Sequence, residues 1–323
     1  MAMTLVDYFK QAKSDESLGF IADLLRAWDP ASIIKWKGVS GLKVSGSRWQ
    51  TLPSTAFRKM NEGYTESSGT TEEFGETLVA VGGDVKIEKL FTKAKNVIED
   101  PLTTQMQMKA RALMFTIADA FINGNQGVNP DSFEGLKTRV SNMPSRQTID
   151  LYAGGDGLPI IKDSTNEHLF LDALHQAIKY VDGANAFFCN ETVYLGLGRL
   201  LRRLGLLEVS TDAYGKVWNT FNGVPFIDVG LKGDKSTEII TNTEDPGDGG
   251  NDCTSIYAVR MDTMDGLHGI ALNGTSPEPY DPLNGGEMEG GPQFLRRIDW
   301  AVGLYNKSQY AIARVKGFRV AAA

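Results

Sequence analysis

DPLTTQMQMKARALMFTIADAFING, residues 100–124, is the stretch that decides the fold. Asp100-Pro101 is a strong helix start, because Asp caps free backbone N–H groups and Pro fits the first turn. Asn123-Gly124 ends the helix. The stretch therefore predicts one rod-like helix of about 22 residues, roughly 33 Å long at 1.5 Å per residue. Its apolar stripe is formed by Leu102, Met106, Ala110, Leu113, Ile117 and Phe121.

A long polar excursion precedes this helix. Residues 42–52 (LKVSGSRWQTL) and 74–81 (FGETLVAV) have β-strand character, and the second places Thr77, Val79 and Val81 on one side. Between them lies the polar, turn-rich stretch STAFRKMNEGYTESSGTTEE. An isolated subunit has little with which to bury the tip of such a hairpin. We therefore expect a loop that is either flexible or held by a partner.

The chain begins with two predicted helices, residues 4–13 and 17–28. Apolar residues recur at helical spacing in the second, and Asp29-Pro30 ends it. Two interpretations are open. These helices are either a packed terminal element or an arm that buries its apolar stripe on a neighbouring subunit.

The remainder of the chain alternates helices and strands, which predicts a mixed α/β body. A helix begins at Ser164 or Thr165, and the strand candidate AFFCN (186–190) leads into the helix ETVYLGLGRLLRRLG. Four short β runs follow: VPFIDVG, TEIIT, TSIYAVRM and LHGIAL. The closing runs PQFLRRIDWAVGLY and SQYAIARVKGF predict a final β pair with its turn near Asn306-Lys307.

Composition bounds the class of protein. The 323 residues suffice for one or two domains, and the net charge of −7 argues against a surface that neutralises nucleic-acid phosphates. Two cysteines, Cys189 and Cys253, predict reduced buried thiols rather than a disulfide framework. The chain has no stretch of 18 apolar residues and no signal-peptide pattern at its start, so we expect no membrane span and a protein made in a cytoplasm.

The candidate chemical sites are weak. His168 and His175 fall on one helix face and His268 is the only other histidine, so a three-histidine metal site is conceivable. The acidic loop 245–252, with Asp245, Asp248 and Asp252, does not have the spacing of a regular calcium loop. GLGRLL lies inside a helix pattern and is no phosphate loop. We expect no catalytic residues, no metal ligands and no cofactor, and hence no enzyme.

Two basic pairs stand out, Arg58-Lys59 in the polar loop and Arg202-Arg203 on the second α/β helix. They form either a solvated face or ion pairs between subunits that fix orientation more than they add affinity. The candidate inter-subunit contact residues are Trp28, Trp36, Arg48, Trp49, Arg58, Lys59, Tyr64, Arg202 and Arg203.

The order of these segments resembles the major capsid proteins of tailed double-stranded DNA bacteriophages with the Hong Kong 97-like fold. FGETLVAVGGDVKIEKLF followed by the 100–124 helix and NQGVNPDSFEGLK is similar to that family's loop strand, spine helix and following segment. FNGVPFIDVG is similar to its axial-domain strand, and FLRRIDWAVGLYNKSQYAIARVKGF to its closing peripheral strands. The likeness covers most of residues 42–320.

The resemblance implies an α+β chain divided into named parts. Residues 1–41 would be the N-terminal arm, 42–83 the extended β-hairpin loop and 183–291 the axial domain. Residues 84–182 and 292–323 would form the peripheral domain, with the spine helix at 100–123.

The resemblance also implies partners and a location. The chain would self-assemble as hexamers and pentamers into an icosahedral shell in a virion, built in the host bacterial cytoplasm. The partners would be a separate scaffold protein, a portal protein, a possible decoration protein and double-stranded DNA held without sequence-specific contacts. Some relatives cross-link a loop Lys to an Asn of a neighbour with help from a Glu. Lys59 and Asn306 could play those parts, although no Glu aligns.

Two rival functions remain open. An encapsulin-like compartment would keep the fold but enclose a cargo protein. A cytosolic metal-dependent hydrolase would use His168, His175 and His268.

Overall fold

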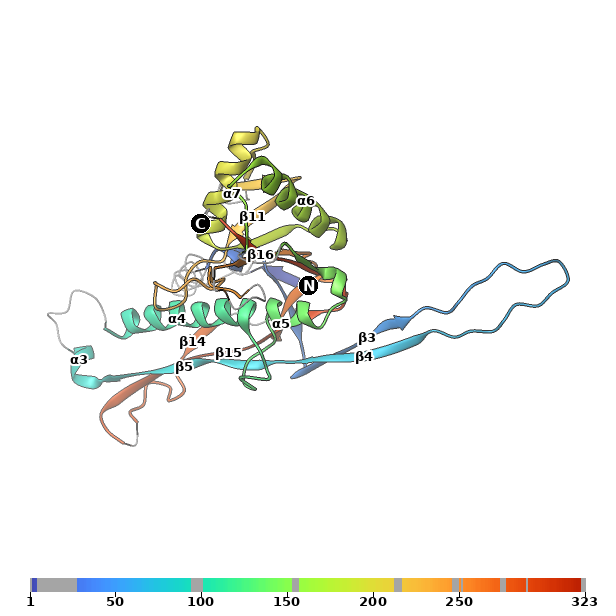
Figure 1. Ribbon diagram of the computed structural model, residues 1–323. Helices are drawn as coiled ribbons and strands as arrows, with labels where there is room; N and C mark the ends of the chain where they lie inside the picture. Colours follow the sequence, from blue (N-terminus) through green and yellow to red (C-terminus); the bar gives the residue numbers. More distant parts are fainter. Residues whose placement is uncertain are drawn as a thin grey trace.

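The computed structural model shows a body with one long hairpin projecting from it (Figure 1). Of the two helices expected at 4–13 and 17–28, only Thr4 and Trp28 are described, so that expectation lies outside the described residues. The described residues are 2–4, 28–93, 101–152, 157–211, 217–245, 250, 252–273, 277–288 and 290–320.

A six-stranded sheet lies on one side of the long helix. Its order is β1-β2-β13-β15-β14, and β5 also pairs with β15. Only β2 and β13 run parallel; the other pairs are antiparallel. The strands are β1 (Ala2–Thr4), β2 (Lys35–Val39), β5 (Val79–Glu88), β13 (Leu267–Leu272), β14 (Glu278–Tyr280) and β15 (Gln293–Asn306). In β5, Val85 and Ile87 are buried on either side of the exposed Lys86.

An eight-stranded sheet forms the rest of the body, in the order β6-β16-β12-β8-β11-β10-β9 with β7 beside β16. The strands are β6 (Thr148–Asp150), β7 (Leu158–Pro159), β8 (Ala186–Cys189), β9 (Glu208–Thr211), β10 (Val217–Phe221), β11 (Val224–Asp228), β12 (Thr254–Val259) and β16 (Ile312–Arg319). Asn222 and Gly223 link β10 to β11, both with positive φ (51° and 75°), as a tight hairpin turn requires.

The helices begin and end where local chemistry dictates. Asp163 accepts a hydrogen bond from Asn166 N at the start of α6, and Asn190 accepts one from Val193 N at the start of α7. Gly205, with φ 69°, ends α7 in the left-handed conformation that glycine favours. The helical segments are η1 (Asp29–Ser32), α3 (Lys89–Lys93), α4 (Pro101–Asn123), α5 (Leu136–Ser141), η2 (Ser145–Gln147), α6 (Ser164–Tyr180) and α7 (Glu191–Leu204).

Helix α4 lies between the two sheets (Figure 1) and confirms the helix predicted from the sequence. Its buried residue Phe121 meets Trp28 edge-on at 5.4 Å between ring centroids and Phe188 of β8 at 5.3 Å. Strands β8 and β12 of the eight-stranded sheet are buried on both faces. Phe188 and Tyr257 face the core shared with α4, whereas Phe187 contributes to a second core under α6 and α7. One sheet thus joins both cores.

The polar excursion forms a separate two-stranded sheet of β3 (Lys43–Thr51) and β4 (Thr70–Thr77). Figure 1 shows this hairpin extending far beyond the body. The expected strand pair 42–52 and 74–81 is found, but the second strand ends at Thr77 and β5 starts at Val79. Buried Leu78 separates them, and it donates its backbone N–H to Leu42 O (2.8 Å) where the hairpin meets the body.

The expected final β pair is wrong. β15 belongs to the six-stranded sheet and β16 to the eight-stranded sheet, and residues 307–311 carry the chain from one to the other. The partners of each strand come from distant sequence, β5 and β13 for β15, and β12 and β6 for β16. Adjacency in sequence therefore misled the prediction.

The β run expected at 237–241 (TEIIT) is also absent as a strand. Ile239 and Ile240 are buried, but amide side chains bind their carbonyl groups in place of a strand partner. Asn123 Nδ2 donates to Ile239 O (2.8 Å) and Asn190 Nδ2 to Ile240 O (3.0 Å).

Sheet membership divides the chain differently from the expected boundaries at 182/183 and 291/292. The segment 148–180, expected in the peripheral domain, shares sheet and core with the expected axial segment. In turn, β13 and β14, expected in the axial domain, pair with β15. The expected boundaries therefore cut through both sheets.

Candidate assembly surface

The tip of the hairpin exposes large apolar side chains that bury nothing in the single subunit. Phe57 and Met60 are fully exposed, at 108% and 94%. Leu52 and Tyr64 are also largely exposed. Apolar surface gathered at the end of a projecting arm indicates a site that another molecule covers.

Local hydrogen bonds order this tip. Arg58 Nη1 donates to Glu62 O (2.9 Å), and its guanidinium lies 5.1 Å from the ring centre of Tyr64. Asn61 takes a positive φ of 68° at the turn, which asparagine tolerates. The two arms are tied further back by Ser67 Oγ donating to Ser54 O (2.8 Å). These contacts give the tip a defined conformation.

Two grooves lie between β5 and α4. One, of about 910 Å³, is lined by the start of β5 and the end of α4, and the other, of about 710 Å³, by the end of β5 and the start of α4. Among the described strands, β5 pairs only with β15, so no described strand covers its other edge along the grooves. Phe91 and Met108, both more than half exposed, line the second groove. Both grooves are lined by polar as well as apolar residues, and an uncovered strand edge beside exposed apolar side chains is typical of a docking surface.

The base of the hairpin is fixed to the body by a buried arginine. Arg139 of α5 pairs with Glu76 of β4 (Nη1–Oε1 2.6 Å) and donates from Nη2 to Leu304 O of β15 (3.0 Å). Arg139 Nε also donates to Glu134 O (2.9 Å). The arginine thus joins the hairpin, α5 and the six-stranded sheet.

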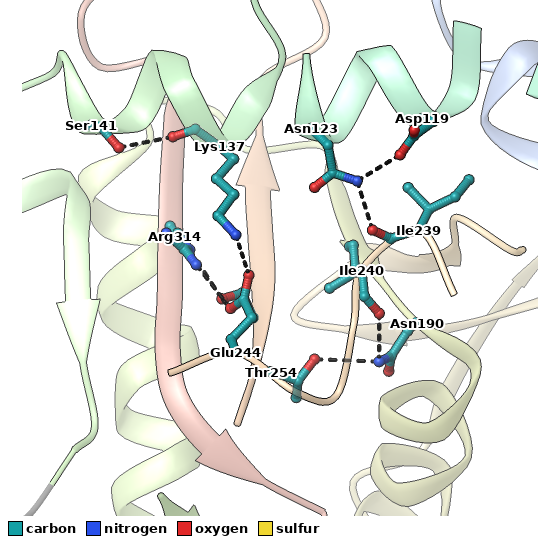
Figure 2. A network of polar contacts seen from close by, with 11 residues as sticks. Asp119, Asn123, Lys137, Ser141, Asn190, Ile239, Ile240, Glu244, Thr254 and Arg314 are labelled. Atoms are coloured by element: carbon teal, nitrogen blue, oxygen red, sulfur yellow. Dashed lines mark hydrogen bonds and ion pairs between the residues drawn. The ribbon is translucent and has the colours of Figure 1, made fainter. Parts of the chain in front are cut away.

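A polar network links the end of α4 and the start of α7 to the segment between β11 and β12 (Figure 2). Asn190 is fully buried and its Nδ2 donates to Ile240 O and lies 3.3 Å from Thr254 Oγ1. Glu244 binds Arg314 Nη2 of β16 (2.8 Å) and Lys137 Nζ of α5 (3.1 Å). These side-chain bonds hold the segment between β11 and β12 together with short backbone bridges such as Glu244–Cys253.

Glu244 is ionised within this network. Burial raises the pKa of its carboxyl group, but the charges of Arg314 and Lys137 and a hydrogen bond from Ser255 outweigh burial. The net effect is a pKa below the usual value. The carboxylate therefore braces α5 against β16 as an ion.

Two of the expected inter-subunit residues lie inside the subunit, which corrects that expectation for them. Trp28 and Trp36 are each 2% exposed. Trp28 packs on Phe121, and Trp36 packs on Trp300 with 4.6 Å between ring centroids. Their large apolar surface is used to close the core against α4 and β15, so little of it is left for a neighbour.

The other expected residues lie on the surface or on the hairpin. Trp49 is exposed, whereas Arg48 pairs with Glu72 (2.9 Å) and lies over the Phe74 ring. Lys59 is exposed at the tip. At the end of α7, Arg202 Nε donates to Gly198 O (2.9 Å) and Arg203 pairs with Glu167 of α6.

The three histidines are engaged separately. His175 is exposed, stacks on Phe221 and hydrogen-bonds Asn222 (2.9 Å). His268 is buried, which lowers its pKa, and its Nδ1 lies 3.2 Å from Asp262 O. His168 is exposed on α6. Within the described part of the chain, no three His, Cys, Asp or Glu side chains are grouped to hold a metal ion.

The thiols, the acidic loop and the suggested cross-link residues are placed as follows. Cys189 and Cys253 are buried and unpaired as disulfides, and burial raises the pKa of the Cys189 thiol well above its usual value. Part of the acidic loop 245–252 lies outside the described residues. Asn306 is buried at the end of β15, far along the chain from the exposed Lys59.

None of the helices in the described part has the length and apolar content that a membrane crossing requires.

Comparison with known proteins gives a partial family match and the fold. Residues 44–160, which contain the hairpin, β5, α4 and α5, match the sequence model of the family described as Major capsid protein GP7. The chain has the Hong Kong 97-like capsid fold. No curated protein matches this chain in sequence.

Solved structures share the fold of this chain over nearly its whole length. The holo-SrpI encapsulin complex from Synechococcus elongatus PCC 7942 has a TM-score of 0.63 at 14% identity, covering 98% of this chain and 96% of that chain. The capsid of a native GTA particle has a TM-score of 0.58 at 13% identity, covering 92% and 90%. A protein of Microbacterium phage Oxtober96 has a TM-score of 0.54 at 12% identity, covering 90% of each chain.

The sequence analysis did not find the residues that brace the body of the protein from within. Arg139, Asn190 and Glu244 are all buried or nearly so, and each binds elements distant in sequence. Only Asn190 carried a usable signal, because Asn followed by an apolar helix is a typical N-cap. The partners of Arg139 and Glu244 depend on the tertiary fold.

Proposed function

We propose that this protein is the major head protein of a tailed bacteriophage and forms the icosahedral shell that encloses its double-stranded DNA. The observation that carries the proposal is the projecting hairpin with its exposed apolar tip, inside the segment that matches the Major capsid protein GP7 family. A neighbouring subunit that covers the tip would explain why its apolar side chains are exposed in the single subunit.

The contact between copies is of the head-to-tail kind. The hairpin tip and the grooves beside β5 are different surfaces, so one copy offers its tip to the grooves of the next. Contacts of this kind close into rings when the rotation permits. Pentamers and hexamers are the rings that build a closed icosahedral shell.

The shell encloses DNA without reading its sequence. A net charge of −7 provides little phosphate neutralisation, so the protein holds the genome by enclosure rather than by strong ionic binding. The further partners are a separate scaffold protein, a portal protein and possibly a decoration protein, with assembly in the host bacterial cytoplasm before the shell becomes part of the virion.

Electron microscopy of the purified chain tests this function, with the chain expressed alone and together with its neighbouring genes. We expect closed shells, or rings of uniform size, under at least one condition. A protein that stays monomeric or dimeric under both conditions would contradict the proposal.

An encapsulin-like compartment is the second candidate, and one observation favours it. The encapsulin complex matches 98% of this chain with a TM-score of 0.63. The contents of purified particles separate the two functions. DNA of defined length supports the phage head, and a single enclosed protein supports the compartment.

A further inference from the structure

The hairpin is attached to the body by very little chain. Residue Leu78 alone separates β4 from β5, and three residues, 40–42, separate β2 from β3. Within the described residues, β3 and β4 pair only with each other, and the sheet ladders of the body do not continue into them. Backbone pairing therefore leaves the direction of the hairpin open, and side chains at its base must set it.

Arg139 supplies the first restraint on that direction. Its side chain is 6% exposed, and its three hydrogen-bonding nitrogens reach Glu76 of β4, Leu304 O of β15 and Glu134 O. A guanidinium group holds its donors in a rigid plane, so satisfying all three acceptors fixes the position of Glu76 relative to β15.

Tyr305 supplies the second restraint. Its ring packs on Phe74 of β4, with 5.3 Å between ring centroids. It also packs on His268 of β13, again with 5.3 Å between ring centroids. The tyrosine is therefore held between the hairpin and the six-stranded sheet. Gly46 of β3 leaves the space that the Tyr305 hydroxyl occupies, because a Cβ at residue 46 would collide with it and lie 3.0 Å from Phe74 Cζ.

We propose that Arg139 and Tyr305 are positioning residues that fix the direction of the hairpin relative to the body, and thereby the curvature of the shell. The inference rests on the proposed function. A tip that reaches the grooves of a neighbour sets the angle between adjacent subunits. Because the hairpin is long, a small rotation at its base moves the tip by a large distance, so the base contacts determine that angle.

The two glycines at the base offer a matched pair of variants. Gly46→Ala places a methyl group against Tyr305, which is confined by Phe74 and His268. Gly75→Ala, one residue pair nearer the body on the same hairpin, meets chiefly the movable end of the Lys43 side chain at 2.8 Å. Both add the same atom to the same two-stranded sheet, but only the first pushes against the body.

The experiment compares wild type, Gly46→Ala, Gly75→Ala and Arg139→Met by two measurements. The first is the distribution of shell diameters in electron micrographs. The second is the distance between spin labels in the unassembled subunit, placed at Lys59→Cys on the tip and Thr165→Cys on α6. The buried Cys189 and Cys253 are checked for labelling in the unsubstituted chain.

We expect Gly46→Ala and Arg139→Met to shift or broaden the label distance and to give shells of altered diameter or open sheets. Gly75→Ala should match wild type in both measurements. The inference is overturned if Gly46→Ala retains both the wild-type distance and the wild-type diameter. Should Arg139→Met fail to fold, Gly46→Ala still decides. Should wild type form no shells, the proposed function fails, and the label distance alone decides whether these residues position the hairpin.

Discussion

Asn190 performs two tasks with one side chain. Its Oδ1 caps α7 by accepting from Val193 N (2.9 Å), and its Nδ2 binds the carbonyl group of Ile240 and the side chain of Asn242 (2.7 Å). An amide is suited to this position because it offers an acceptor and two donors together. Aspartate would cap the helix equally well but could not donate to Ile240 O.

Asn190→Ala should destabilise the subunit by about 2–3 kcal/mol, because it removes a helix cap and leaves a buried carbonyl group without its donor. Asp163→Ala is the matched control. Asp163 caps α6 through Asn166 N (2.9 Å) but is exposed and holds no buried segment, so the loss should be about 1 kcal/mol. Urea unfolding of both variants measures the difference, and equal losses would mean that only the cap matters.

Glu244 makes the stability of the subunit sensitive to acid. Its folded pKa is lowered from the ordinary value of 4.5, so its contribution is present above that pH and is lost as pH falls through the folded pKa. The stability difference between wild type and Glu244→Gln should therefore be largest near neutral pH and shrink below pH 4.5. Urea unfolding at a series of pH values tests this, and a difference that is constant with pH would refute it.

At the scale of elements, α4 contributes to the core through one face. Phe121 on that face is fully buried between Trp28 and Phe188, whereas Phe115 lies half-buried beside Gly233. We expect Phe121→Ala to lower the free energy of unfolding by about 3–5 kcal/mol. Phe115→Ala should lower the free energy of unfolding by clearly less. If urea titrations gave similar decreases for the two variants, the Phe121 face of α4 would not be its main contact with the core.

The hairpin should affect assembly without affecting folding. Serine at both Phe57 and Met60 removes exposed apolar surface, so the free energy of unfolding should change by less than about 0.5 kcal/mol. Shell formation should be lost or require a much higher protein concentration. Light scattering during assembly measures this.

The control for that experiment is Leu195→Ser on α7, which removes an apolar side chain that is 53% exposed and lies outside the hairpin. It should assemble as wild type does. If the double serine variant assembles at the wild-type concentration, the tip is not a contact between subunits.

The elements that the sequence predicted well are those defined by local pattern. The α4 stripe, the start of α6 at Ser164 and the alternation of Val79 and Val81 in β5 follow from neighbouring residues, and all are found. Pairing is different. β15 pairs with β5, which lies more than 200 residues earlier in the chain, as the pair Phe294 and Ile87 shows. No local sequence signal predicts that β15 pairs with β5 rather than with the adjacent β16.

The candidate site divides in the same way. The polar composition of residues 54–73 predicted a loop that is either flexible or held by a partner, and the residues at its tip are exposed in the single subunit. Trp28 and Trp36 could not be placed, because an apolar residue near a chain end suits an internal core and a neighbour's surface equally well. Only the tertiary contacts with Phe121 and Trp300 distinguish these cases.

At the scale of the whole molecule, the eight-stranded sheet couples the two cores. Alternate residues of β8 point to opposite sides, so Phe187 belongs to one core and Phe188 to the other. A strand that loses its packing on one face also loses the backbone alignment that the other face requires. The two cores should therefore unfold together, although the chain crosses between the sheets several times.

Hydrogen exchange of the unassembled subunit tests this coupling. Amides of β8 and β12 should exchange only through global unfolding, because both strands are interior to the eight-stranded sheet. Amides of residues 52–69 should exchange rapidly, since these residues are exposed and form no sheet ladder. Phe187→Ala and Ile117→Ala, one in each core, should lower the protection of β12 alike. If either substitution left that protection unchanged, the cores would be independent domains, and the shared sheet would be a junction between them rather than a common structural element.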